Sequence, residues 1–567
     1  MGGRAGGGRG HRMITSCFLE SSASAPELRV AVLLDGARVP RWALAVLEDI
    51  ARSSFARVVL AVEQRPAAAP RRLGALAYAI YDRVDRAIAG DADPLALVDP
   101  GAWLWGVDRA PVPAAGEDGE LRLPAEALAE LGRRGIDVIL RLCAAVPRGE
   151  VLGAARCGVW SFRDGADERS RGGAPFFQEI VGGDVTREVA LEVVDGEPGG
   201  GRVLCRSTFA PQGGMSAARR RYAPIWETTH LVLRKLHELH ERGWEQVLRH
   251  APPRRPSATA ARGASPPTTA EMARFLVPRA ASAIARRLRP KTRERWRFAV
   301  RRTSAPLFAA PGPRDASDFR WIEAPRGRCW ADPFLFEQGG ATHVFFEDLE
   351  HDRGFAGISH AEVRSDGALG EPRRCLDPGF HLSFPLVFEH EGEVFMLPES
   401  LSNGTVTLYR ARRFPDVWVQ EKVLFRGNAV DTAVWRARGS FYFFATLCDR
   451  DDRGMTTVLF VADSLTGAWR MHPVNPVSSD VRRARGAGAI FRRGGRLFRP
   501  VQDCGPCYGH GVALEEIVAL TEDRYEARPF CWVDRSRLAI PAGGVHTYNQ
   551  AGPIEVIDGW IAEPGGR

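Results

Sequence analysis

Five carboxylates recur at similar places in the second half of the chain. Asp332 and Asp431 each precede an apolar strand-like run, and Glu347, Glu399 and Asp503 each follow one. Cleavage of a glycosidic bond needs two carboxyl groups beside the sugar, one protonated and one ionised. Crowding of like charges raises the pKa of one group, which then acts as an acid near neutral pH. The pattern predicts Asp332 as base, Glu399 as acid and Asp431 as the group that tunes the acid.

These carboxylates belong to a repeat of strand–turn–strand units. "DPFLFEQGGATHVFFED" (332–348) is echoed at 384–400, 431–446 and 487–503, each time with a turn between two apolar runs. Spacings of 52, 47 and 56 residues separate the aligned positions, which are Phe336, Phe388, Trp435 and Phe491. An all-β repeat of about 50 residues is typical of a propeller, whose blades are four-stranded sheets around a channel. With a partial fifth repeat at 546–560, the sequence predicts a five-bladed β-propeller over 315–567.

Inner strands of a propeller converge, so the repeated carboxylates are expected to form a cluster. Further side chains near them are expected to contact a ligand, namely Trp330, Glu347, Trp435, Arg485, Arg499, Asp503 and Tyr508. Sugar binding without catalysis, cation binding and bonds between blades stay open as alternatives. "CGPC" at 504–507 has redox spacing but a loop-like setting, and no metal site is predicted.

The string "WADPF…VFFED…FPLVFEHEGEVFMLPES…DTAVW…RGAGAIFRRGGRLFRPVQDC" resembles the N-terminal domain of glucosamine inositolphosphorylceramide transferases over about 320–565. The resemblance implies a five-bladed propeller related to glycoside hydrolase family 43. In that family a blade-one Asp is the base and a later Asp tunes the acid, which places Asp332 and Asp431 in those roles. The family's acid has no secure counterpart here, and Glu399 stands in for it. The resemblance implies a glycan context more strongly than catalysis.

Residues 28–250 alternate apolar runs with helical stretches, which predicts an α/β domain with a mostly parallel sheet. "VWSFRDGADERSRGGAPFFQEI" and its surroundings resemble the formyltransferase fold of methionyl-tRNA and sugar N-formyltransferases. That family uses an Asn and a His in an N-x-H motif and an Asp in a later L-D-x-G motif. Ser161, Arg163 and Gly199 stand at those positions, with Asp195 as a shifted substitute. The resemblance therefore implies a formyltransferase-like domain that is inactive, with formyl-tetrahydrofolate as cofactor only if it is active.

The remaining segments are expected to be connecting or terminal. Residues 1–27 are expected to be a disordered tail without a secretory signal, and 251–314 a Pro/Arg-rich linker with a basic helical segment. Residues 254–302 carry 14 Arg and Lys against two acids. This segment is a candidate for contact with an anionic membrane at 274–302, with Phe275, Leu276, Ile284, Leu288 and Trp296 as apolar anchors. No nucleic-acid signature accompanies the charge.

The sequence favours a cytoplasmic, carbohydrate-related protein. Peripheral contact with a membrane through 274–302 stays open. Its propeller is expected to bind or process a glycan or nucleotide-sugar in the biosynthesis of a bacterial surface polysaccharide or glycolipid. Two alternatives remain, an active sugar N-formyltransferase and a non-enzymatic scaffold at a membrane surface.

Overall fold

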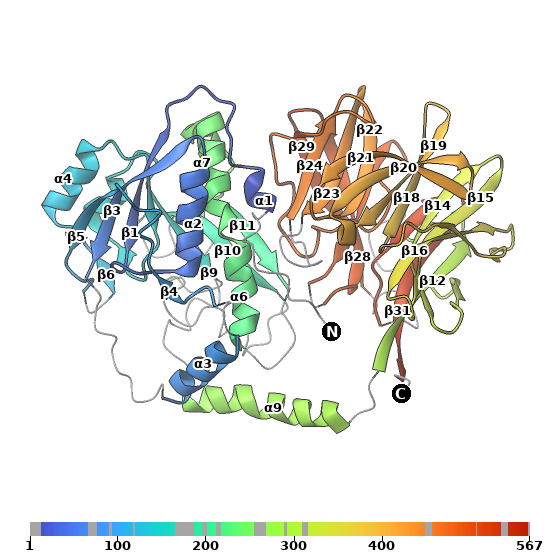
Figure 1. Cartoon of the computed structure of the whole chain (residues 1–567), viewed down its shortest axis with the longest axis horizontal. Coiled ribbons are helices and arrows are strands. Elements are labelled where there is room, and N and C mark those ends of the chain that lie inside the picture. Colours follow the sequence, from blue (N-terminus) through green and yellow to red (C-terminus); the bar gives the residue numbers. More distant parts are fainter. Residues whose placement is uncertain are drawn as a thin grey trace. The chain divides into compact units, whose positions relative to one another are not determined.

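The computed structural model describes residues 13–65, 76–89, 93–116, 119–164, 186–195, 201–210, 217–254, 268–288, 292–308, 316–447, 456–505, 507–534 and 543–564. They form two compact units, Met1–Leu288 and Arg289–Arg567 (Figure 1). No described helix is long and apolar enough to cross a membrane.

The first unit is built on a seven-stranded sheet in the order β11-β10-β9-β7-β1-β3-β5. Strands β5, β3, β1, β7 and β9 are parallel, and β10 and β11 add an antiparallel edge, which confirms the predicted mostly parallel sheet. The bounds are β1 Leu28–Leu34, β3 Ala56–Gln64, β5 Asp108–Val112, β7 Val138–Arg141, β9 Val159–Asp164, β10 Arg187–Val194 and β11 Arg202–Phe209. Two short pairs lie outside this sheet, β2 Val39–Pro40 with β4 Leu97–Val98 and β6 Glu120–Leu121 with β8 Val146–Pro147.

Helices cover the sheet with amphipathic faces. Helix α2 buries Trp42, Val46 and Ile50, spaced by four residues, and lies beside α7 (Figure 1). The helices are α1 Met13–Ser16, α2 Arg41–Arg52, α3 Leu76–Ala89, α4 Ala125–Arg133, α6 Ala217–Glu227, α7 His230–Arg242, α8 Trp244–Arg249 and α9 Thr269–Leu288, with a 3-10 turn η3 at Gly149–Gly153.

Part of the segment expected to be a disordered tail is packed against α7. Ile14 and Phe18 are buried, and Phe18 meets the His237 ring edge-on. Glu241 accepts hydrogen bonds from Ser21 Oγ at 2.6 Å and from the Ala23 backbone at 3.2 Å. The expectation of disorder was wrong for 13–27, because this short segment contributes apolar side chains to the core. Residues 1–12 lie outside the described part.

The second unit contains five four-stranded sheets, which confirms the five-bladed propeller. Blades one to four follow the chain from the innermost strand outward: β14 Arg328–Gln338, β15 Ala341–Glu350, β16 Phe355–Val363, β17 Arg373–Leu376; β18 Ser383–His390, β19 Glu393–Ser400, β20 Thr405–Arg413, β21 Val417–Arg426; β22 Ala429–Ala437, β23 Ser440–Leu447, β24 Thr456–Ala462, β25 Arg470–Met471; β26 Phe491–Arg493, β27 Arg496–Asp503, β28 Gly511–Leu520, β29 Tyr525–Asp534. A 3-10 turn, η5 Leu401–Asn403, follows β19.

Blade five joins the two ends of the propeller. Its order is β30 Tyr548–Ala551, β31 Ile554–Pro564, β12 Thr292–Arg302 and β13 Arg320–Ile322, with β12 paired along β31. The expectation that 292–302 belongs to the linker and basic helical segment is wrong, because these residues form strand β12. Trp296, Phe298 and Val300 alternate with arginines, which is the pattern of a strand with one apolar face. Phe298 and Val300 are buried in the core.

The first hairpin of blades one to four has the same two-residue turn. Both turn residues have positive φ, as type I′ turns require; the pairs are Gly339–Gly340, Glu391–Gly392, Arg438–Gly439 and Gly494–Gly495. This repeated turn fixes the register of the innermost strands, and so the height of the side chains they present.

Candidate functional site

Three innermost strands carry the same backbone irregularity. Asp332, Phe384 and Asp431 have φ of 48°, 47° and 51°, each beside a register shift in its blade's first strand pair. A left-handed backbone is uncommon for residues other than glycine and is an outlier for a bulky side chain. Such strain persists only where the surrounding structure holds it, and it is frequent at functional sites. Asp332 and Asp431 thus occupy equivalent positions, and Phe384 is their counterpart in blade two.

Each left-handed residue donates its backbone N–H to a carboxylate of the preceding blade. Asp332 donates to Asp558 Oδ2 at 3.2 Å, and Phe384 donates to Asp332 Oδ2 at 3.1 Å. Asp431 donates to Glu399 Oε2 at 3.3 Å. The strained backbone therefore links neighbouring blades and draws the carboxyl groups together.

A second row of side chains comes from the second strand of each blade. Glu347 pairs with Ala331 and Glu399 with Ser383, directly before the left-handed residue. Gln502 holds the corresponding place in blade four, and its amide donates to Gly486 O at 2.8 Å. Asp503, expected to line this site, is one residue further on. Its carboxylate accepts the Trp532 indole N–H at 2.7 Å, because successive side chains of a strand point to opposite faces.

We call Asp332, Glu347, Glu399, Asp431 and Asp558 the carboxylate cluster, because each interacts electrostatically with other members. The three residues predicted as catalytic all belong to it. Burial raises the pKa of Glu347 to about 8, and the Asp332 charge adds to this shift. Burial also raises the pKa of Glu399 well above its usual range, with Asp431 as the next cause. Glu347 therefore holds a proton at neutral pH, and Glu399 takes up a proton more readily than an exposed glutamate.

Asp431 is locked in an ion pair. Arg485 donates to its two oxygens at 2.6 and 3.3 Å, and both side chains are buried. The guanidinium carbon lies 5.1 Å from the centre of the Tyr508 ring, and Tyr508 is half-exposed. With both oxygens engaged, Asp431 is placed to act on its neighbours through its charge.

Asp332 is held by groups from blades five and two. Thr547 Oγ1 donates to its Oδ1 at 2.6 Å, and His546 Nδ1 lies 3.8 Å from the same oxygen. Burial raises the pKa of Asp332, and His546 opposes this shift. Burial alone would lower the pKa of His546, but Asp558 and Asp332 outweigh it and raise that pKa to about 9. The imidazole is thus charged at neutral pH.

Three residues expected to contact a ligand belong to the packed interior instead. Trp330 is buried, donates to Asp348 Oδ1 at 3.0 Å and packs on Phe346. Trp435 packs on an apolar cluster between blades. Arg499 is buried against Glu515 at 3.2 Å. Trp330 precedes Ala331 and Asp332 by one or two residues, so strand alternation and the irregular backbone turn its ring away from them.

Four further residues of the site come from blade five, and sequence reasoning missed their role. They are Trp296, His546, Thr547 and Asp558. Blade five is assembled from both ends of the propeller and lacks the carboxylate positions of the other repeats. The repeat of about 50 residues therefore does not indicate these four residues, although it predicts that 546–560 is part of a blade.

In the first unit, the positions of the expected degenerate formyltransferase motif have structural partners. Ser161 Oγ accepts from Arg141 at 3.3 Å, and Arg163 pairs with Glu188 at 3.0 Å and Glu192 at 3.3 Å. Gly199 and residues 169–180 lie outside the described residues. The parallel sheet stands, but a formyltransferase identity is not confirmed.

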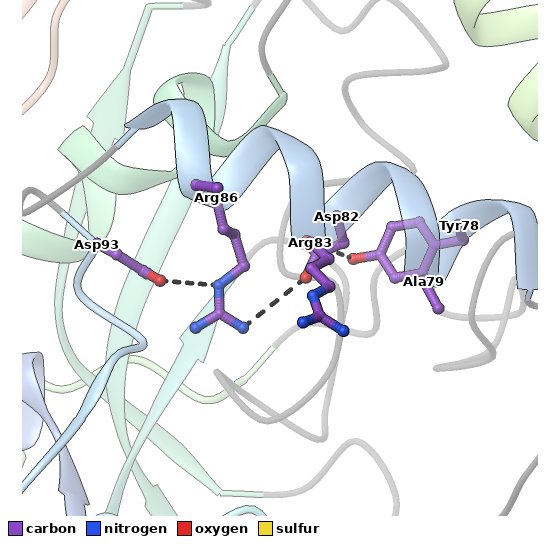
Figure 2. Close-up of a pocket in the computed structure, with 7 residues that line it drawn as sticks. Tyr78, Ala79, Asp82, Arg83, Arg86 and Asp93 are labelled. Atoms are coloured by element: carbon purple, nitrogen blue, oxygen red, sulfur yellow. Dashed lines mark hydrogen bonds and ion pairs between the residues drawn. The ribbon is translucent and has the colours of Figure 1, made fainter.

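A surface hollow lies along α3, lined by Tyr78, Arg83 and Arg86 among others (Figure 2). Arg86 donates to Asp93 at 2.7 Å and lies 3.8 Å from Asp82. Acidic neighbours therefore balance the charge of this arginine.

The fold and site define a five-bladed propeller with a buried carboxylate cluster on its inner strands. Residues 323–535 match the family model described as glucosamine inositolphosphorylceramide transferase 1, N-terminal, so this region carries that domain. Glucosamine inositolphosphorylceramide transferase 1 of Arabidopsis thaliana is 35% identical over 201 residues, 34% of this chain and 26% of that protein. The Oryza sativa subsp. japonica protein is 35% identical over 204 residues, 35% and 27%. The chain thus spans about a quarter of the length of these relatives.

Solved structures show weaker likenesses. An exo-β-1,3-galactanase from Clostridium thermocellum has 14% identity and a TM-score of 0.31, covering 37% of this chain and 53% of that one. A family 117 glycoside hydrolase from Zobellia galactanivorans has 11% identity and 0.31, covering 47% and 90%. Glycinamide ribonucleotide transformylase 1 from Symbiobacterium toebii has 16% identity and 0.27, covering 38% and 88%. Likenesses of this size carry no conclusion about activity.

Proposed function

We propose that the propeller binds a glycan at the carboxylate cluster and acts on it by acid–base chemistry, in the making of a surface polysaccharide or glycolipid. The observation that carries this proposal is the coexistence, in one buried cluster, of Glu399, whose pKa is raised well above its usual range, and the oriented carboxyl of Asp332. The name of the curated relatives adds a glycolipid context.

The residues have distinct roles in this scheme. Glu399 gives its proton to the leaving oxygen, since a carboxylic acid with a raised pKa serves as general acid. Asp332 is the base, aimed by Thr547 and the Phe384 N–H. Asp431, fixed by Arg485, keeps Glu399 protonated through its charge. The half-exposed Tyr508 and the partly buried Trp296 offer ring faces for a sugar.

The test uses the full chain on an array of neutral and amino-bearing oligosaccharides, followed by turnover assays on each hit. Glu399→Gln is expected to keep binding and lose turnover by about 100-fold or more, the usual contribution of a general acid. Asp332→Asn is expected to lose turnover as well. Asp503→Asn is the control, because that carboxylate faces Trp532. Equal loss in Asp503→Asn and Asp332→Asn would contradict the assignment, and a folded chain without any hit would contradict glycan binding.

For the first unit we propose a ligand-binding or structural role without formyl transfer. Ser161 and Arg163 occupy the positions where an Asn and a His would be needed, and arginine cannot act as a base at neutral pH. Incubation with formyl-tetrahydrofolate and amino-sugar nucleotides tests this role, and a formylated product would overturn it.

A peripheral membrane contact through α9 is a second candidate, supported by its exposed face. Val277 and Ile284 are 65% and 61% exposed, whereas Phe275 is buried against Tyr81. Of the expected anchors, Phe275 is buried and Trp296 stacks on His546, whereas Ile284 is exposed and Val277 lies exposed on the same helix. Flotation with phosphatidylserine vesicles should weaken in Val277→Ser/Ile284→Ser and persist in the control Val518→Ser. Equal flotation of all three proteins would exclude this face.

A further inference from the structure

His546 lies at the centre of the site, between two carboxylates from different strands. Its Nδ1 is 2.5 Å from Asp558 Oδ2 on β31 and 3.8 Å from Asp332 Oδ1 on β14. Glu347 on β15 also interacts electrostatically with it. From the two remaining sides come rings, Trp296 on β12 and Tyr508 in the loop after β27.

The surroundings fix the ring in one orientation. Trp296 stacks on the imidazole with 4.0 Å between ring centres and 17° between planes, and Tyr508 meets it edge-on at 5.3 Å. The Thr547 hydroxyl gives its proton to Asp332, so its oxygen, 3.2 Å from Nδ1, is free to accept. A proton on Nδ1 thus faces both Asp558 and Thr547.

Asp558 is itself immobilised. It accepts the backbone N–H groups of His546 at 3.0 Å, Thr547 at 2.9 Å and Asp332 at 3.2 Å. The last bond comes from the left-handed residue that is also the proposed base. The same carboxylate therefore sets the positions of both the imidazole and the backbone of Asp332.

We propose that His546, held by Asp558 and Trp296, is a positioning residue that keeps the Asp332 carboxyl ionised and aimed. This inference rests on the proposed function, in which Asp332 is the base. A carboxylate in a buried site prefers to be neutral unless an opposite charge lies close. Arg485 is engaged with Asp431, which leaves His546 as the cation that faces Asp332 among the described residues.

The proposal also changes which part of the chain makes up the site. Trp296 belongs to β12, outside the 323–535 region that matches the family model. A propeller cut at 315 would lack the ring on which His546 stacks. Experiments on the site therefore need the full chain.

The test is an NMR titration of the full chain with labelled histidine and aspartate. His546 is expected to titrate near pH 9, and Asp558→Asn should lower its pKa by about one to three units. His546→Gln should raise the pKa of Asp332, read from its carboxyl carbon. His472→Gln is the matched control, a buried histidine bonded to the Thr521 carbonyl at 2.8 Å, and should leave Asp332 unchanged.

Two results would overturn the proposal: a His546 that titrates below pH 7, or an Asp332 titration that ignores His546→Gln in a folded protein. If His546→Gln does not fold, the wild-type and Asp558→Asn titrations of His546 decide. Failure of the proposed function is distinguishable, since it would appear as absent glycan binding with the His546 titration still high. If His546 titrates below pH 7 while the protein still turns over a glycan, the role of His546 is refuted and the proposed function stands.

Discussion

Replacement of Arg485 by Met should destabilise the propeller strongly. The Arg485 and Asp431 side chains are 7% and 4% exposed, so water cannot take over the two bonds of 2.6 and 3.3 Å. Without Arg485, Asp431 keeps a Gln502 amide at 3.5 Å and Glu399 as neighbours. Removal of one partner of a buried ion pair typically costs about 3–5 kcal/mol, because the remaining charge is uncompensated. We expect a loss in this range for Arg485→Met.

Urea unfolding at pH 7 of the full chain, followed by tryptophan fluorescence and near-UV circular dichroism, measures this loss. The two units need not unfold together, so the propeller transition is assigned by the signal that Arg485→Met shifts. The double variant Arg485→Met/Asp431→Asn should recover at least half the loss, since it removes the buried charge. The control Arg524→Met breaks an exposed pair with Glu526 and should produce no resolvable shift. A loss below about 1 kcal/mol, or a double variant as unstable as the single one, would refute the reasoning.

Three further outcomes are expected. The free energy of unfolding of the propeller should fall as pH rises. Glu347 should cause this fall between about pH 4.5 and 8, and His546 between about pH 6.5 and 9. Both pKa values are raised by folding, so the folded state binds more protons there; Glu347→Gln should flatten the lower part of a plot of unfolding free energy against pH. A fragment that starts at 315 should lose cooperative thermal unfolding, whereas 289–567 keeps it, because β12 pairs along the whole of β31. Glu391→Gly should raise the unfolding free energy by roughly 1 kcal/mol, since Glu391 is an exposed residue with φ of 53°; Glu393→Gly, in the adjacent strand, should lower it.

Most of the propeller could be predicted because its repeat is carried by local chemistry. The two-residue turns and the apolar runs recur in sequence, and so do Asp332 and Asp431 at one backbone position. The same alternation that makes strands recognisable makes a one-residue error costly. The sequence predicts that Asp503 and Trp330 face the ligand, but each side chain points to the other side of its strand.

Blade five and the site residues that it contributes depend on pairings between distant segments, which a sequence repeat does not encode. Strand β12 was hidden by its arginines, which read as a solvated basic segment. In the fold Arg295 pairs with Glu563 at 2.7 Å and Arg301 with Glu555 at 2.7 Å, so these cations neutralise blade five. The alternation of Trp296, Phe298 and Val300 was the available indication of a strand. His546 had no equivalent in the other repeats, so its partners Asp558 and Asp332 become visible only when the propeller closes.

The bonds between blades do not by themselves explain why the cluster is acidic. Asn549 links blades with a neutral amide: its Oδ1 accepts the Ala489 N–H at 2.7 Å and its Nδ2 donates to Pro333 O at 2.8 Å. An asparagine at 332 or 431 could accept hydrogen bonds in the same way and would avoid the free-energy cost of burying a charge. The cluster contains five carboxyl groups. Among the described residues, the cations that act on Asp332, Glu347 and Glu399 are Arg485 and His546. Proton exchange at the cluster supplies a reason for carboxyl groups that inter-blade bonding alone does not.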